Sequence, residues 1–176
     1  MDVKFNFTKL EASTRALMVD EIKRAEESGQ LYFSARFNDA GTRGWLAWLT
    51  SAVEQRDEHW LAYQLEVASA MKHLEQRTKP KGGYTVAHVP DTAAETMAEG
   101  QFNRFYMAAI CRRAIEDGKT NVRVYRAKHR GEPRLESRAL EGTSRDADTL
   151  LQELRSKDLS LRCELLKPNS GLSIDY

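Results

Sequence analysis

Residues 91–118 read DTAAETMAEGQFNRFYMAAICRRAIEDG and carry the pattern of one long helix. Thr92 and Glu95 have capping-box spacing, which satisfies free backbone amides where a helix begins. The pair Asp117-Gly118 supplies a stop, because glycine readily adopts the left-handed conformation that ends helices. The sequence therefore predicts a long central helix, with helical segments before it and a mixed region after it.

The N-terminal part predicts an amphipathic helix followed by an extended segment. Thr8 and Glu11 again have capping-box spacing, apolar residues recur on one helical face, and Ser28-Gly29 ends the pattern. Residues 31–37 alternate between apolar and more polar side chains, which is typical of a half-buried strand. We expect a short strand or an extended connection there.

Two further helices and a break follow. Asn38 or Asp39 can cap the second helix, and apolar residues at helical spacing predict a third helix over about residues 57–76. Residues 77–90 contain two Pro and two Gly that disrupt helices, so we place the internal boundary there. At most a very short extended piece is expected within this segment.

After the central helix, the pattern changes to short mixed elements. Valines and a tyrosine at 122–125 favour a strand, and Asp146 can cap a short leucine-rich helix. Residues 159–166 resemble a strand, and Pro168-Asn169-Ser170-Gly171 resembles a turn. Residues 172–174 are expected to pair as a last strand.

Together these elements predict an α+β fold that is predominantly helical. It has a helical N-terminal half, a long central helix and a small C-terminal β-sheet with one short helix. The expected regions are a helical part over 1–78, a flexible linker or loop over 79–90, and a long helix plus small α/β region over 91–176. We expect the two halves to pack as one domain, since 176 residues suit one ordinary domain.

Composition restricts the classes of function. The chain has 27 Lys and Arg against 26 Asp and Glu, so it is not a polycation that coats nucleic acid by bulk charge. Its apolar runs are far shorter than the roughly 20 residues of a membrane span, and its start lacks a signal-peptide layout. Two separated cysteines, Cys111 and Cys163, favour buried free thiols. We therefore expect a cytoplasmic protein with no membrane contact.

One segment is locally basic. Residues 101–138 carry ten positive residues against four acidic ones. Such an excess can bind phosphates, but it can equally form a solvated face or pair with acidic residues of the N-terminal half. The candidates for an acidic partner or a nucleic acid are Arg104, Arg112, Arg113, Arg123, Arg126, Lys128 and Arg130.

The sequence contains no pattern typical of catalysis, cofactor binding or metal binding. The four histidines are not at metal-ligand spacing, and Ser170 lacks the glycines of a nucleophile elbow. We therefore predict no catalytic, cofactor-binding or metal residues, although dispersed catalytic groups can meet in a fold. Trp45, Trp48 and Trp60 are at helical spacings that favour core positions; if exposed, they are candidates for a protein interface.

The C-terminal half resembles an uncharacterised family of bacterial and phage-associated proteins. The likeness lies in QFNRFY at 101–106, CRRAI at 111–115, VYRAK at 124–128, PR at 133–134 and PNSGL at 168–172. The resemblance implies no activity and no functional residue. It implies a link to phage or mobile elements, which favours a particle-assembly or capsid-type protein.

The leading prediction is a non-enzymatic assembly or interaction protein that self-associates as a homo-oligomer or with protein partners. A phage-derived particle is its expected setting, and the virion is then an alternative location to the cytoplasm. Broad contact surfaces suit such a role without a reactive cleft. The alternative is a nucleic-acid-binding module that uses the basic C-terminal half.

Overall fold

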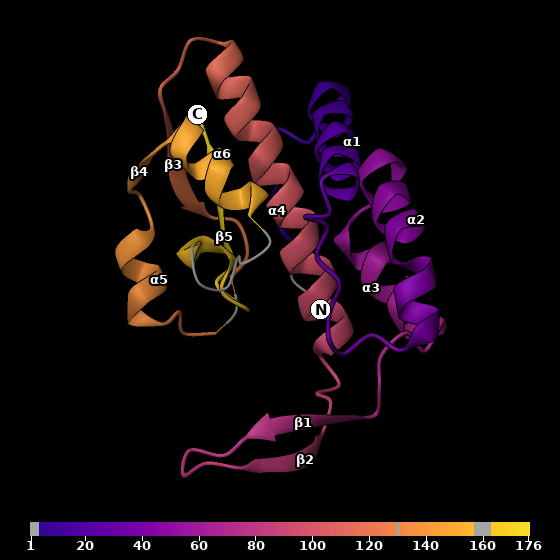
Figure 1. Cartoon of the computed structure of the whole chain (residues 1–176). Coiled ribbons are helices and arrows are strands. Elements are labelled where there is room, and N and C mark those ends of the chain that lie inside the picture. Colours follow the sequence, from indigo (N-terminus) through magenta and orange to yellow (C-terminus); the bar gives the residue numbers. More distant parts are fainter. Residues whose placement is uncertain (1–3, 130, 157–162) are drawn as a thin grey trace. The chain divides into compact units, whose positions relative to one another are not determined.

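The computed structural model describes residues 4–129, 131–156 and 163–176, and its chain forms two compact units (Figure 1). We call Met1–Tyr32 with Gly100–Tyr176 the sheet unit, and Phe33–Glu99 the hairpin unit. The predicted fold class is confirmed, because the structure is α+β and mainly helical with a small C-terminal antiparallel sheet. The long central helix is confirmed as α4, which runs over Ala93–Glu116.

The hairpin unit begins with two helices, α2 (Asp39–Gln55) and α3 (Glu58–Val67). The Asn38 side chain accepts a hydrogen bond from the Gly41 amide at 3.0 Å, which confirms the predicted cap. It also donates to the Ser69 carbonyl oxygen at 2.6 Å and so ties the start of α2 to the residues after α3. The two helices bury apolar side chains that include Trp45, Leu49, Leu61 and Leu65.

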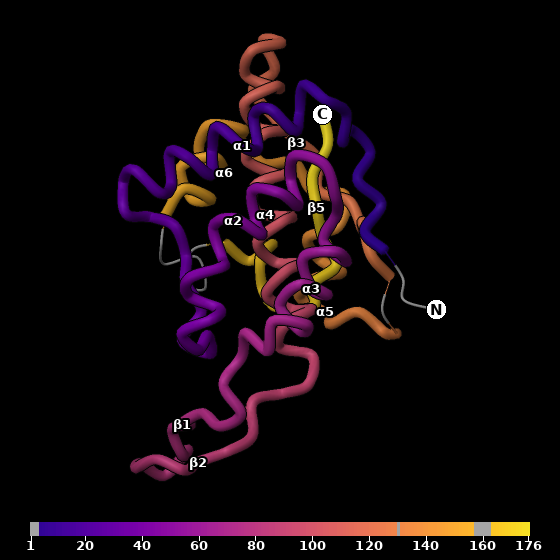
Figure 2. Tube along the Cα trace, turned by 90° about the vertical axis from the view of Figure 1, so that its right-hand side faces the viewer, coloured from indigo at the N-terminus to yellow at the C-terminus, as the bar shows by residue number. Residues whose placement is uncertain are grey.

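The hairpin that gives this unit its name consists of β1 (Leu74–Thr78) and β2 (Tyr84–His88). The two strands pair antiparallel and form a sheet of their own. The expectation of a helix up to residue 76 was wrong, because α3 ends at Val67 and Ser69 has φ 47°. The hairpin extends away from α2 and α3 in both views (Figures 1 and 2).

The sheet unit contains a three-stranded antiparallel sheet in the order β4-β3-β5. Its strands are β3 (Asn121–Arg126), β4 (Ser144–Asp146) and β5 (Leu172–Asp175). The helices of this unit besides α4 are α1 (Ala12–Glu27), α5 (Leu135–Leu140) and α6 (Ala147–Arg155). The Asp146 side chain accepts from the Thr149 amide at 2.8 Å, so the predicted cap of α6 is confirmed.

A buried polar pair joins α4 to β5. The Asn103 side chain donates to the Leu172 carbonyl oxygen and accepts from the Ser173 hydroxyl, both at 2.8 Å. Around this pair, α4 and the sheet bury a continuous set of apolar residues. The set includes Phe102, Tyr106, Ala109, Ile110, Val122, Val124, Leu150, Leu154 and Ile174.

Three local predictions need correction. The Thr8 hydroxyl does not cap α1; it donates to Asp175 at 2.9 Å, and Glu11 occupies the N-cap without a capping hydrogen bond from its side chain. Of the two alternatives for residues 31–37, a short strand or an extended connection, the structure has no strand: the segment is a connection that ends in a turn at 34–37, with one isolated bridge from Phe37 to Met71. Residues 164–166 form a 3-10 turn instead of a strand, and 159–162 lie outside the described residues.

Candidate interaction surface

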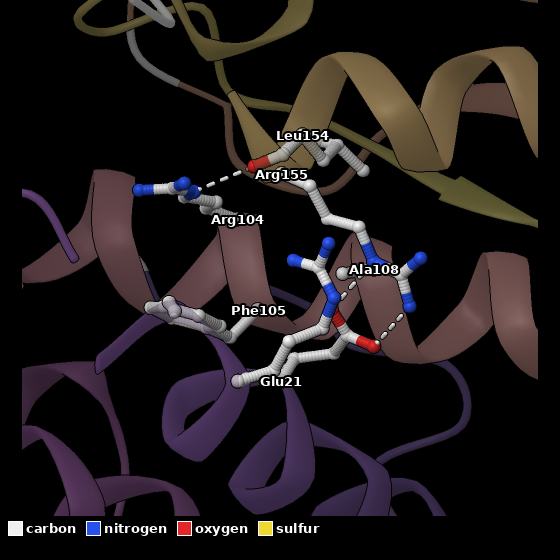
Figure 3. Close-up of a pocket in the computed structure, with 8 residues that line it drawn as sticks. Glu21, Arg104, Phe105, Ala108, Leu154 and Arg155 are labelled. Carbon is white, nitrogen blue, oxygen red and sulfur yellow. Dashed lines mark hydrogen bonds and ion pairs between the residues drawn. The ribbon is translucent and has the colours of Figure 1, made fainter. Parts of the chain in front are cut away.

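Arg104, the first basic candidate, lies in the interior of the sheet unit, with 1% of its surface exposed. Its Nε donates to the Leu154 carbonyl oxygen at 2.8 Å (Figure 3). Burial lowers the pKa of Arg104 to about 10, so the guanidinium stays charged at neutral pH. The adjacent cavity, which Glu21, Phe105 and Arg155 also line, has room for about one water molecule.

Glu21 of α1 is the centre of an ion-pair cluster that uses Arg112. Its carboxylate, 3% exposed, accepts two hydrogen bonds from Arg155, at 3.0 and 2.8 Å (Figure 3). Arg112 donates to the same carboxylate at 3.3 Å. Arg113 nearby binds Glu11 and donates to the Thr14 hydroxyl at 2.6 Å. These arginines neutralise acids at the N-terminal helix. Pairing with acidic residues of the N-terminal half was one of the alternatives to phosphate binding that the sequence left open.

The remaining basic candidates lie in or after β3. Arg126 binds Glu141 and the Ser170 carbonyl oxygen at 2.8 and 2.9 Å. Lys128 is buried, and its ammonium lies 5.8 Å from the centre of the Phe5 ring. Arg123 is exposed, and Arg130 lies outside the described residues. The structure therefore does not bring the seven candidates together into one accessible basic face within its described part.

The tryptophans divide between core and partial exposure. Trp45 is fully buried in the hairpin unit and packs against Phe37, with ring centroids 5.3 Å apart. Trp48 and Trp60 are half-buried. A Cβ at Gly44 would lie 2.2 Å from the Trp48 ring, so a larger residue there would displace this ring from its present position. Trp60 is the only one of the three on α3, where other apolar side chains are exposed.

The cysteines and the possible metal ligands are described next. Cys111 and Cys163 are both buried free thiols, and burial raises the pKa of Cys111 to about 12. Within residues 4–129, 131–156 and 163–176, no three His, Cys, Asp or Glu side chains are grouped to hold a metal ion. None of the helices in that same part of the chain has the length and apolar character needed to cross a bilayer.

An exposed apolar surface that the sequence did not predict lies on the hairpin. The register pairs Leu74 with His88, Gln76 with Val86, and Thr78 with Tyr84. Directly paired residues point to the same side of a sheet, so these six share one face. We call them the apolar hairpin face, since its large members Leu74, Val86 and Tyr84 are 50%, 62% and 71% exposed.

The opposite face of the hairpin is charged and anchored to its own unit. Glu75 binds Arg36 through two hydrogen bonds at 2.6 and 3.0 Å, and Arg77 lies 2.7 Å from the same carboxylate. Hydrogen bonding to Arg36 and Arg77 lowers the pKa of Glu75. These ion pairs hold the base of the hairpin and leave the apolar hairpin face uncovered.

The tip of the hairpin is basic. Lys79 and Lys81 flank Pro80, and Gly82 and Gly83 follow with φ of 87° and 82°. Only glycine adopts such angles readily, so the two glycines make the tight return to β2 possible. The Lys79 amide donates to the Gly83 carbonyl oxygen at 2.9 Å and closes the turn.

A second exposed apolar surface of the same unit lies on α3. Tyr63 and Val67 are 59% and 62% exposed, and half-buried Trp60 precedes Tyr63 by three residues. Residues at i, i+3 and i+7 lie along one face of a helix. We call Trp60, Tyr63 and Val67 the α3 stripe. Its exposure could not be read from the sequence, because core and surface stripes have the same spacing.

Comparison with known proteins assigns no relative to the chain. No family model, no curated protein and no solved structure matches it.

Proposed function

We propose that this chain is a non-enzymatic assembly protein that self-associates through the hairpin of β1 and β2. The observation that carries the proposal is the apolar hairpin face, where three large apolar side chains are at least half exposed on one small sheet. Contiguous exposed apolar side chains favour a protein interface, whereas single ones need no explanation. Their register on one face makes them contiguous.

The stability of the hairpin supports the same proposal. An isolated two-stranded hairpin is at best marginally stable in water, and further burial is needed to hold it firmly. Leu74, Val86 and Tyr84 do not bury against the hairpin unit, since each remains at least half exposed. A protein surface against this face would supply the missing burial and exclude water from the apolar side chains.

The setting of this assembly is the second part of the proposal. The resemblance of the C-terminal half to a phage-associated family favours a particle of phage origin, such as a capsid. Repeated subunits of such particles bind each other through extended surfaces. Among the basic candidates that the structure describes, Arg123 is the exposed one, and it is the residue we would test first for contact with a packaged nucleic acid.

Light scattering after size-exclusion chromatography tests the proposal over a range of protein concentrations. We expect wild-type chain to form dimers or larger species at high concentration. The double variant Tyr84→Ser and Val86→Ser should self-associate at least tenfold more weakly, because it removes apolar area from the interface. Thr85→Ala, on the opposite face of β2, is the matched control and should behave as wild type. A wild type that stays monomeric at every concentration would rule the proposal out.

A further inference from the structure

We propose that the apolar hairpin face of one copy docks on the α3 stripe of a second copy. The inference rests on the proposed self-association and names the surface that receives the hairpin. Both surfaces belong to the hairpin unit, so their description does not depend on the sheet unit. Each offers large apolar side chains that are half-buried or exposed, and neither covers the other within one chain.

The two surfaces match in length. Thr78 is four positions after Leu74 on an extended strand, which corresponds to about 13 Å along the hairpin. Val67 is seven positions after Trp60 on the helix, which corresponds to about 10 Å along α3. A helix laid along one face of the hairpin can therefore contact the apolar side chains of both surfaces over most of their length.

Their charges are complementary. Residues 72–88 carry four cations, Lys72, Arg77, Lys79 and Lys81, against the single acid Glu75. Residues 54–67, which include α3, carry four acids, Glu54, Asp57, Glu58 and Glu66, against the single cation Arg56. Glu58 is buried, but Glu66 of α3 and Glu54, near the end of α2, are exposed. The basic tip of a hairpin can therefore pair with exposed acids of α2 and α3, which steers association and sets its orientation.

The same charges argue against one alternative, in which two hairpins pack face to face with their tips at the same end. Such a pair brings Lys79 and Lys81 of one copy near those of the other, and like charges at an interface oppose binding. An intramolecular contact is also disfavoured, since the hairpin extends away from its own α3 (Figure 2). A second copy that supplies its α3 satisfies both constraints. The contact joins two different patches and is therefore head-to-tail.

A complementation experiment tests the head-to-tail contact. One variant, Tyr84→Ser with Val86→Ser, has a disabled hairpin and an intact α3. The other, Tyr63→Ser with Val67→Ser, has a disabled α3 stripe and an intact hairpin. All four side chains are more than half exposed, so both variants should fold, which circular dichroism verifies.

Each variant alone should self-associate at least tenfold more weakly than wild type. An equimolar mixture should form a one-to-one heterodimer, because it contains one functional copy of each surface. If the α3 variant self-associates as strongly as wild type, the receiving surface is not α3, while self-association through the hairpin stands. A monomeric wild type would instead overturn the proposed function itself, so the two failures are distinguishable.

A charge exchange provides a second test. Lys79→Glu with Lys81→Glu should weaken self-association, and Glu54→Lys with Glu66→Lys should do the same, since each places like charges across the contact. Mixing the two charge variants should restore binding between unlike chains. Mixtures that remain as weak as the separate variants would contradict the orientation that the charges define. Retention of a DNA or RNA oligonucleotide by wild type, without self-association, would assign the basic tip to nucleic acid and overturn the inference.

Discussion

Charge has different roles in the ion-pair cluster of the sheet unit and in the hairpin. In the sheet unit, Glu21 lies buried among Arg112 and Arg155, and its charge is satisfied within the protein. In the hairpin, Lys79 and Lys81 lie exposed at the tip beside an uncovered apolar face. The difference teaches that a local excess of basic residues does not by itself mark a binding site. Substitutions in the first region should change stability, whereas those in the second should change association.

The largest effect is expected for Glu21→Gln. Removing this carboxylate leaves two guanidinium groups close together, and breaking a buried ion pair costs about 3 kcal/mol or more. Because Arg112 and Arg155 are partly exposed, we expect a loss of about 3 kcal/mol in the free energy of unfolding, measured with urea. Asp20→Asn is the control: Asp20 is exposed and should contribute less than about 0.5 kcal/mol. Equal effects of both substitutions would contradict the central role of Glu21.

A somewhat smaller loss is expected for Asn103→Ala in the same unit. The substitution removes two buried hydrogen bonds and leaves the Leu172 carbonyl oxygen and the Ser173 hydroxyl without this partner. Such a change costs about 2 kcal/mol, which denaturant unfolding measures directly. Gln152→Ala, at an exposed position of α6, should have almost no effect. A neutral Asn103→Ala would mean that α4 is not held to β5 by this pair.

In the hairpin unit, Asn38→Ala should cost about 1 kcal/mol. It removes the N-cap of α2 and the bond to the Ser69 carbonyl oxygen, and cap losses are typically of this size. Thermal unfolding followed by circular dichroism measures the change. Arg43→Ala, an exposed position on the same helix, is the control. If the control is as destabilising as the cap variant, the capping role assigned to Asn38 is incorrect.

The smallest change in stability is expected for Tyr84→Ser with Val86→Ser, although it should alter association most. Both side chains are largely exposed, so the free energy of unfolding of dilute monomer should change by less than about 0.5 kcal/mol. Urea unfolding below the concentration of self-association measures this quantity. A loss above 2 kcal/mol would show that these side chains stabilise the monomer. It would contradict the distinction between an ion-pair cluster that sets stability and a hairpin that sets association.

The sequence predicted the elements that have clear starts and stops. Asp117-Gly118 correctly ended α4, and Asn38 and Asp146 correctly capped α2 and α6. The hairpin was missed because Ala68, Ser69 and Ala70 carry no helix stop, although Ser69 adopts a positive φ. The first strand, LEQRT, also carries a single apolar residue, so its sequence shows no alternating apolar pattern.

The candidate surface was harder to predict than the fold. A count along residues 101–138 correctly finds many arginines, but Glu21 and Glu11 lie 91 and 102 residues away from Arg112 and Arg113, which bind them. Only the folded chain brings these charges together. Exposure of Leu74, Val86 and Tyr84 is likewise a property of the tertiary structure, because apolar residues at the same spacing are equally typical of a core.

The bond from Thr8 to Asp175 has a consequence for synthesis of the chain. It spans 167 residues, so the sheet unit cannot close before its last strand has left the ribosome. The α3 stripe and the hairpin are both complete by residue 88. We therefore expect neighbouring nascent chains to present both surfaces to each other while the sheet unit is still unfinished. The proposed assembly would then begin on the polysome, and its order would follow the direction of translation.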